Sequence, residues 1–460
     1  MKKETEKEYK CSTALMVGGL GELEEKFAEL EQAIYLNRLE EAEQLITELS
    51  SIADLTVAQA TGLAFAEAEL SYWRVYYDEA EEHFKAALYN SERRLKDPFC
   101  IARAYYGLGR VERKRGHHDR AIDLLETARQ RLKGLTETKA QFLDALIRFN
   151  LGVLNQKIGL MAQSEELLKK AVEDLQSIEG GRFYGLTLNS LGIVTMLLGK
   201  YQEALSLFLK ATDIFSEQAI LEDLAWSRYN TAFVLTCLKR HKEAKSILLD
   251  CLELDRRLGD PVREARSLEL LAEIALALKA PDEAVQLSRQ AVELAELSRN
   301  DYAIAGALLV WGRSLATLDR TKAIEVLNRA MELAEAHDEK REMIGANIYL
   351  AEVMLGMNRV KTGQYLSAAE KLLAQCPDKY LESQARAIKK KLEQNPVEVS
   401  DDTFLIHKNR LPTWRTAKRS LEVFLLKSAL EQTNYSGNET AKLLKISKAT
   451  VSEKRDLYKI

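Results

Sequence analysis

Residues 190–212 have the sequence SLGIVTMLLGKYQEALSLFLKAT, and this stretch decides the fold. A small residue, Gly192, precedes a second small residue, Ala204, by twelve positions, with a polar turn between them. Phe208 and Ala211 follow Ala204 by four and seven positions, so these three side chains share one face of a helix. Helices approach closely only where side chains are small. The stretch therefore predicts a helical hairpin whose crossing is set by Gly192 and Ala204.

The same pattern recurs along the chain with a period of about forty residues. The small residue of the second helix, called the slot below, recurs at Ala42, Ala80, Ala121, Ser164, Ala204, Ala244, Ala284, Ala323 and Gly363. Such a period is typical of a solenoid, in which each hairpin buries its apolar face against the next. We predict an all-α superhelical solenoid of about nine helical hairpins over residues 21–393, preceded by a tail at residues 1–20.

The composition agrees with a helical protein that has a sizeable core. Of the 460 residues, 46% are hydrophobic and 30% are charged, and only 6 are proline. No apolar run is long enough to cross a membrane, and the apolar stretch near the N-terminus is short for a signal peptide. The 5 cysteines are scattered and include no CxxC pair. We therefore expect a cytoplasmic protein with reduced thiols and no membrane contact.

The sequence offers no group of residues that would carry catalysis. It contains no GxxxxGK[ST] phosphate loop, no GxSxG elbow and no HExxH metal motif. The one histidine pair, His117–His118, falls in a predicted turn with no third ligand at a suitable spacing. We expect no catalytic residue, no metal site and no cofactor, and hence a protein that is not an enzyme.

The strings FNLGVLNQKIG, residues 149–159, and SLGIVTMLLGKYQEALSLFLKAT resemble tetratricopeptide repeats, although these units are longer than the usual roughly 34 residues. The resemblance implies a superhelix whose first helices line a concave groove for peptides or partner proteins. The groove-facing positions that it implies are Arg103, Tyr106, Arg110, Arg113, Phe149, Asn150, Trp226, Tyr229, Asn230, Phe233, Arg266, Glu269 and Glu273.

These positions form a basic and aromatic set that would hold an acidic or aromatic peptide. The amides of Asn150 and Asn230 can both donate to and accept from an extended backbone. For the aromatic residues the alternative is packing between neighbouring repeats, and for the arginines it is a solvated face. The dense cluster SYWRVYY, residues 71–77, is either packing or an exposed adhesive surface.

The last part of the chain differs in charge and pattern. Residues 401–460 hold 12 Lys and Arg against 7 Asp and Glu, whereas the rest holds 54 against 63. Within it, residues 428–460, SALEQTNYSGNETAKLLKISKATVSEKRDLYKI, predict a helix-turn-helix. Ala441 is small where the second helix crosses, Ile446 and Val451 are expected to pin the two helices together, and Ser447 is a good N-cap. A basic tail on an acidic body is typical of a local nucleic-acid contact.

Residues 413–460 resemble the Fis-type DNA-binding domain of bacterial regulators, after a proline-flanked linker at residues 394–412. The resemblance covers a long helix, a polar turn and two short helices. Lys445 stands where that family prefers glycine, so a positive φ is expected there. Tyr435, Ser436 and Glu453 also depart from the family pattern.

The resemblance implies double-stranded DNA as a partner and a homodimer that reads two half-sites. The implied DNA-binding residues are Lys442, Lys445, Ser447, Lys448, Thr450, Ser452, Lys454, Arg455, Arg415 and Arg419. Lys448, Thr450, Ser452 and Arg455 would meet base edges, and the other cations would meet phosphates. The implied dimerisation residues are Trp414, Leu421, Phe424 and Leu425.

Together these features predict a bacterial transcriptional regulator. Its C-terminal domain would bind specific DNA sequences under the control of a peptide or protein in the repeat groove. The alternative is a non-enzymatic scaffold or adaptor whose tail contacts protein rather than DNA. DNA binding by the C-terminal domain would distinguish the regulator from the adaptor.

Overall fold

The computed structural model describes residues 22–35, 38–178, 180–355, 357–394, 397–399, 404–406 and 413–460. The chain divides into two compact units, Met1–Leu258 and Gly259–Ile460, and each is described by itself. The predicted tail at residues 1–20 and most of the predicted linker at residues 394–412 lie outside the described residues. No described helix is both long and apolar enough to cross a membrane.

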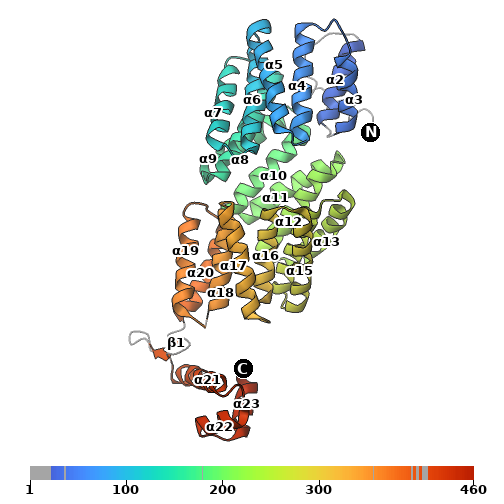
Figure 1. Cartoon of the computed structure of the whole chain (residues 1–460). Coiled ribbons are helices and arrows are strands. Elements are labelled where there is room, and N and C mark those ends of the chain that lie inside the picture. Colours follow the sequence, from blue (N-terminus) through green and yellow to red (C-terminus); the bar gives the residue numbers. More distant parts are fainter. Residues whose placement is uncertain are drawn as a thin grey trace. The chain divides into compact units, whose positions relative to one another are not determined.

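The first unit is a series of helical hairpins, coloured from blue to yellow-green in Figure 1. The first helices of these hairpins are α2 (Glu22–Tyr35), α4 (Val57–Trp73), α6 (Pro98–Lys114), α8 (Thr138–Lys157), α10 (Gly181–Leu197) and α12 (Leu221–Cys237). The second helices are α3 (Leu39–Ser50), α5 (Tyr77–Asn90), α7 (His118–Arg131), α9 (Met161–Ser177), α11 (Tyr201–Glu217) and α13 (His241–Leu258). A short π-helix, η2 (Ser91–Leu95), extends α5.

The second unit continues the same hairpins. They are α14 (Pro261–Ala277) with α15 (Pro281–Ser298), α16 (Asp301–Leu315) with α17 (Arg320–Ala336), and α18 (Lys340–Met354) with α19 (Arg359–Leu373). The single helix α20 (Lys379–Gln394) follows. The fold is therefore a helical-hairpin solenoid, as the sequence predicts.

A small β-hairpin departs from the predicted linker. The strands β1 (Val397–Val399) and β2 (Phe404–Ile406) pair antiparallel, with Val397 opposite Ile406 and Val399 opposite Phe404. Both strands consist largely of β-branched and apolar residues, which favour strand pairing. This segment is short, so periodicity could not distinguish it from irregular linker.

The slots are the best-buried positions of the hairpins. Every slot residue from Ala42 to Ala323 is 0% exposed. The last slot corrects the sequence prediction by one residue: Thr362, not Gly363, is fully buried, and Leu366 and Ala369 follow it at four and seven positions. The Thr362 hydroxyl donates to the Asn358 carbonyl at 2.8 Å, so a polar side chain is satisfied inside the core.

Glycines of the first helices explain how closely each hairpin packs. A Cβ at Gly152 would lie 2.7 Å from the side chain of Leu168, and one at Gly192 would lie 2.6 Å from that of Phe208. Both opposing residues are four positions after a slot. The slot also touches the first helix, because the Ser164 hydroxyl donates to the Gly152 carbonyl at 2.6 Å. The hairpin crossing thus depends on two features: the small slot residue of the second helix, and a glycine of the first helix that faces a large side chain of the second.

Three helices end the second unit: α21 (Trp414–Gln432), α22 (Gly437–Leu444) and α23 (Lys448–Tyr458). Their core is formed by Leu426, Leu430, Ala441 and Val451. Ser447 caps α23 by accepting from the Thr450 amide at 3.0 Å, as predicted. We call these helices the C-terminal three-helix unit.

The turn between α22 and α23 confirms one prediction and corrects another. Lys445 has a φ of +52°, the left-handed conformation expected where glycine is preferred. The Ile446 amide then donates back to the Ala441 carbonyl at 3.0 Å, which closes a Schellman-type turn. Ile446 is 36% exposed and Val451 is 1% exposed, so of the predicted pair only Val451 lies in the core.

Candidate functional site

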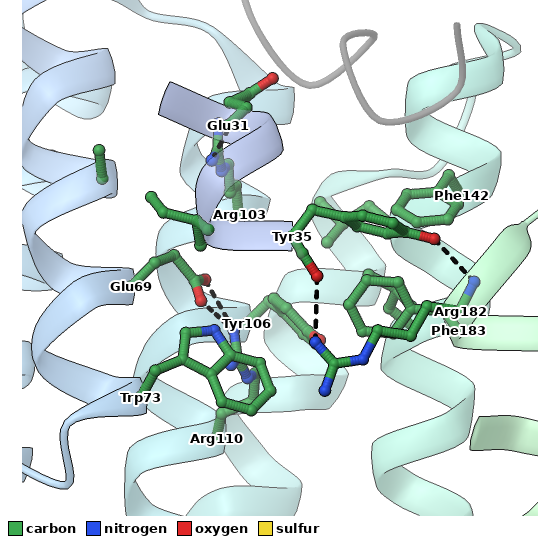
Figure 2. A pocket seen from close by; sticks show the side chains of 14 residues that line it. Glu31, Tyr35, Glu69, Trp73, Arg103, Tyr106, Arg110, Phe142, Arg182 and Phe183 are labelled. Carbon is green, nitrogen blue, oxygen red and sulfur yellow. Dashed lines mark hydrogen bonds and ion pairs between the residues drawn. The ribbon is translucent and has the colours of Figure 1, made fainter. Parts of the chain in front are cut away.

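A cavity of about 800 Å³, counted together with its opening to solvent, lies in the first unit (Figure 2). It is lined by the first helices of the first five hairpins, α2, α4, α6, α8 and α10. Its aromatic walls come from Tyr35, Trp73, Tyr106, Phe142 and Phe183. Its charged groups are Glu31, Glu69, Arg103, Arg110 and Arg182. A concave, largely apolar site with a few converging charges is typical of ligand binding.

Arg110 of α6 and Glu69 of α4 form a close buried ion pair. Arg110 Nη1 donates to Glu69 Oε1 at 2.7 Å and to Oε2 at 2.9 Å. The guanidinium lies 4.0 Å from the centroid of the Tyr72 ring and 5.3 Å from that of Tyr106. Arg110 is 7% exposed, so a solvated face does not describe it. Its burial is possible because Glu69 neutralises it and two rings stack near it.

Arg103 of α6 and Glu31 of α2 form a looser pair. Arg103 Nη2 lies 3.5 Å from Glu31 Oε1, and neither carboxylate oxygen has a hydrogen bond of good geometry. The Arg103 guanidinium also lies 4.5 Å from the centroid of the Phe65 ring. Burial raises the pKa of Glu31 to about 7, and the nearby Arg103 offsets this only in part. Glu31 is therefore a buried acid that can hold a proton near neutral pH.

Tyr35, the last residue of α2, closes the cavity against α10. Its hydroxyl accepts from the Arg182 backbone amide at 2.7 Å, and its carbonyl accepts from Arg182 Nη1 at 3.0 Å, as Figure 2 shows. Arg182 Nε in turn donates to Asp223 Oδ2 of α12 at 2.7 Å. The Phe183 ring packs edge-on against Tyr35 and Phe142, at centroid distances of 5.7 and 5.8 Å. The end of α2 is thus joined to a helix 147 residues further along the chain.

Gly181 makes this contact possible. Its φ is +49°, and a Cβ there would lie 2.5 Å from the Tyr35 hydroxyl. A side chain at this position would separate Tyr35 from α10.

The predicted groove residues of the first unit fall into three groups. Arg103, Tyr106 and Arg110 line the cavity. Asn150 is 2% exposed and is used inside the core, where its amide donates to the Leu146 carbonyl at 2.9 Å and to the Tyr106 hydroxyl at 3.3 Å. The NH2 group of Asn150 is thus used inside the protein, while its Oδ1 has no hydrogen-bond partner, and a contact with a ligand stays a prediction.

The remaining first-unit positions lie away from the cavity lining. Arg113 donates to the Tyr72 hydroxyl at 3.5 Å, and Phe149 packs against a core cluster around Leu168. Asn230 donates to Asn189 Oδ1 at 3.1 Å. The other three members of the prediction are Trp226, which is exposed, and Tyr229 and Phe233, which are half-buried. Trp226 and Tyr229 pack edge-on, with their ring centroids 6.0 Å apart, and form an aromatic surface there.

Arg266, Glu269 and Glu273 of the predicted groove belong to the second unit. The Arg266 guanidinium lies 4.8 Å from the centroid of the Tyr302 ring. Glu273 accepts from the hydroxyls of Tyr349 and Tyr380, each at 3.2 Å. Burial raises the pKa of Glu269 to about 7, and Arg266 opposes this.

The cluster at residues 71–77 also divides. Tyr72 is buried, Trp73 lines the cavity, and Tyr76 is exposed. The dense aromatic stretch is therefore partly packing and partly cavity wall. The packing interpretation is confirmed for Tyr72, whereas the adhesive surface stays a prediction.

The sequence prediction missed Glu31, Tyr35, Glu69, Trp73, Phe142, Arg182 and Phe183. One position of the repeat would have identified Glu31 and Glu69 among them. We call it the ladder position: it lies eleven residues before the slot, or ten in the last two hairpins. Its occupants are Glu31, Glu69, Arg110, Val153, Ile193, Phe233, Glu273, Arg313 and Glu352. Charges occupy the first three and last three hairpins, and apolar residues occupy the middle three.

Among the described residues, no group of three or more His, Cys, Asp or Glu side chains is placed to hold a metal ion. The geometry of the cavity, with aromatic walls and paired charges, suits non-covalent recognition.

Comparison with known proteins supports the repeat assignment. Residues 76–133, 143–217 and 223–296 match the model of the tetratricopeptide repeat family, so these segments are tetratricopeptide repeats. A curated relative, the mitochondrial tetratricopeptide repeat protein 19 homolog of Drosophila melanogaster, is 33% identical over 106 residues. That match covers 23% of this chain and 28% of the relative. The chain thus spans well under a third of that relative's length.

Solved structures share the fold at low sequence identity. The apo form of RapI has a TM-score of 0.56 at 16% identity and covers 80% of this chain and 98% of its own. The apo form of the quorum sensor NprR from B. thuringiensis has a TM-score of 0.58 at 16% identity, covering 76% and 97%. A Rap protein complexed with Competence and Sporulation Factor has a TM-score of 0.55 at 16% identity, covering 81% and 99%. These likenesses show that the solenoid shares the fold of these three structures.

Proposed function

We propose that this protein is a non-enzymatic regulator whose solenoid binds a peptide or protein segment and whose C-terminal three-helix unit binds double-stranded DNA. The observation that carries the first half is the cavity, where five first helices bring aromatic walls and three guanidinium groups together. The fold is shared with a quorum sensor and with a Rap protein that was crystallised with a signalling factor. A peptide ligand is the natural proposal for this surface.

The second half is supported by exposed cations on the last two helices. Lys442, Lys445 and Lys448 are all exposed around the turn between α22 and α23. Arg415 and Arg419 are exposed on α21. Lysines at a helix-turn-helix can neutralise DNA phosphates and release counterions.

We narrow the proposed set of DNA contacts by the partners that these side chains already have within the protein. Lys454 Nζ pairs with Glu422 Oε2 at 2.8 Å, and the Tyr458 hydroxyl donates to the same oxygen. Arg455 Nε donates to the Ile460 carbonyl at 3.4 Å. Lys454 and Arg455 are therefore held by the protein itself. We assign the first DNA contacts to Lys442, Lys445, Lys448 and the exposed Ser452. The hydroxyls of Ser447 and Thr450 bond each other at 2.8 Å within the N-cap.

A homodimer through α21 is part of the same proposal. Trp414 is 82% exposed, and Leu421 and Leu425 are also exposed on this helix. Phe424 lies beside them and is half-buried. An exposed apolar stripe of this kind on one helix suits pairing with a second copy.

The test is DNA binding by the full chain at several salt concentrations. We expect retardation of double-stranded genomic fragments at low salt, and a log–log salt slope that falls by about 1 when Lys448 or Lys442 is changed to Ala. Lys210→Ala, an exposed lysine on α11, is the matched control and should leave the slope unchanged. If DNA is not bound at low salt, or Lys448→Ala and Lys210→Ala behave alike, the adaptor alternative stands instead.

A further inference from the structure

The three arginines that line the cavity of the first unit each pair with an acid, and the three pairs differ in geometry. Arg110 with Glu69 and Arg182 with Asp223 each have a donor–acceptor distance of 2.7 Å. The pair of Arg103 and Glu31 is held at 3.5 Å, without a hydrogen bond of good geometry to either carboxylate oxygen. Glu31 is 8% exposed, so water does not make up this loss. It is the one carboxylate of the three whose present partners leave it poorly satisfied.

We infer that the cavity binds a carboxylate attached to an aromatic or apolar body, and that this carboxylate replaces Glu31 as the partner of Arg103. The inference rests on the proposed role of the solenoid as the ligand-binding part, and it names the chemical class of the ligand. Glu31, on this view, occupies the anion site in the absence of ligand.

The walls fit such a body. The lining is largely apolar and aromatic, with a few charged groups, as is typical of ligand sites. Trp73, Phe142 and Phe183 supply flat apolar surface, and Leu143 and Leu146 supply aliphatic surface. An aromatic side chain or ring would stack there while its carboxylate reaches α6.

The charge balance favours an anion over a cation. With Asp223 counted as the partner of Arg182, three guanidinium groups meet three carboxylates. Protonation of Glu31 therefore leaves the positive charge of Arg103 without a balancing anion. An incoming carboxylate would pair with Arg103, whose planar guanidinium matches it geometrically.

When the ligand carboxylate displaces Glu31 from Arg103, Glu31 takes up a proton from solvent. Once it loses Arg103, the ionised Glu31 would be a buried charge without a partner, so it takes up a proton and leaves the site neutral. The charged groups that act on it are Arg103 of α6 and Glu69 of α4, which Arg110 already holds. The helix α3 reaches α2 through Glu48, which pairs with Lys26 at 3.0 Å. Ligand binding is therefore coupled to the uptake of up to one proton.

The test is calorimetric titration of the full chain with three probes that share one body: 3-phenylpropanoate, 3-phenylpropanamide and 3-phenylpropylamine. We expect the acid to bind at least tenfold more tightly than the amide, and the amine to bind weakest. The tripeptide Ala-Ala-Phe as free acid and as C-terminal amide distinguishes a peptide terminus from a small acid as the source. Equal binding of acid and amide, or tighter binding of the amine, overturns the inference.

The proton provides a second readout that needs no variant. Titrations at pH 8 in two buffers of different ionisation enthalpy should show proton uptake, and the affinity for the acid should fall several-fold from pH 6 to pH 8. Glu31→Gln should remove this pH dependence, whereas Glu29→Gln, an exposed residue of the same helix, should keep it. Binding of the acid without proton uptake contradicts the exchange with Glu31. No DNA is present, so the ligand and DNA proposals can fail separately.

Discussion

The two units place charge at the same repeat position but satisfy it differently. In the first unit the ladder position holds Glu31, Glu69 and Arg110, next to an open cavity. In the second unit it holds Glu273, Arg313 and Glu352, and Arg313 pairs with both glutamates at 3.5 Å.

The difference lies in what surrounds the charges. Glu273 accepts hydrogen bonds from Tyr349 and Tyr380, and the Arg313 guanidinium lies 4.8 Å from the centroid of the Tyr349 ring. This network is closed by the protein's own donors. Glu31 in the first unit lacks such donors. The same solenoid position can thus stabilise the fold in one unit and remain exchangeable in another.

The largest expected effect comes from replacing the arginine at the ladder position in each unit. Arg110→Met leaves Glu69 buried without its partner and should lower the free energy of unfolding of the first unit by about 3 kcal/mol. Arg313→Met should cost less, about 1–2 kcal/mol, because two tyrosine hydroxyls still satisfy Glu273. Urea unfolding combined with hydrogen exchange, which resolves the units, measures both. The double variant with Glu69→Met and Arg110→Met should recover most of the free energy of unfolding that Arg110→Met loses. If Arg110→Met and Arg313→Met lowered this free energy equally, the proposed difference between the two units would be wrong.

The next effect is the pH dependence of stability in each unit. Glu31 and Glu269 both have a pKa raised from a usual value of 4.5 to about 7. The folded state then binds more protons than the unfolded state between these values, so each unit should lose stability as the pH rises through that window, by up to about 3 kcal/mol. Urea unfolding at pH 5 and pH 8 measures this.

Two single variants distinguish the contribution of each unit to this pH dependence of stability. Glu31→Gln should stabilise the first unit at pH 8 and have little effect at pH 5, and Glu269→Gln should act in the same way on the second unit only. Stability that rises with pH in both units would contradict the burial of these acids in uncharged form.

A smaller effect tests whether the hairpins themselves are equivalent. A Cβ at Gly152 would lie 2.7 Å from Leu168, and one at Gly312 would lie 2.6 Å from Leu327. Changing either glycine to Ala should therefore cost about 1–2 kcal/mol, since overpacking exceeds the gain in helix propensity. Thermal unfolding of the two variants should give similar shifts. A cost in only one unit would show that the close crossing is not shared.

The smallest effect concerns one hydroxyl in each unit. Tyr35→Phe removes the acceptor of the Arg182 amide, and Tyr380→Phe removes one of the two tyrosine donors to Glu273. Each should cost about 1 kcal/mol. Hydrogen exchange should show faster opening of α2 only for Tyr35→Phe, because that hydroxyl joins α2 to α10. Unchanged protection of α2 would mean that packing on Phe183 alone holds it.

Much of the fold could be predicted because its signals are local. The spacing of Gly192, Ala204, Phe208 and Ala211 follows from helix geometry, and the structure buries Ala204, Phe208 and Ala211 completely. The one-residue shift from Gly363 to Thr362 was missed because a buried threonine looks polar until its hydroxyl is seen to bond the preceding turn. The left-handed Lys445 was predictable because the turn geometry constrains a single residue.

The site was less predictable because its partners come from different hairpins. Arg110 and Tyr106 were identified from their place on a first helix, but Glu69 is 41 residues from Arg110. Tyr35 and Arg182 are farther apart still, and no repeat period relates them. The sequence also could not show that the NH2 group of Asn150 donates to the Leu146 carbonyl and the Tyr106 hydroxyl.

The sequence by itself determined the helical hairpins, their period, their buried slots and the charge contrast between body and tail. These depend on which side chains share one helix face, and helix geometry makes that a local property. Only the tertiary structure decided which charges meet, that α2 closes on α10 and that Glu31 is left poorly satisfied. Those outcomes depend on small rotations between successive hairpins, which accumulate along a solenoid and bring distant residues together.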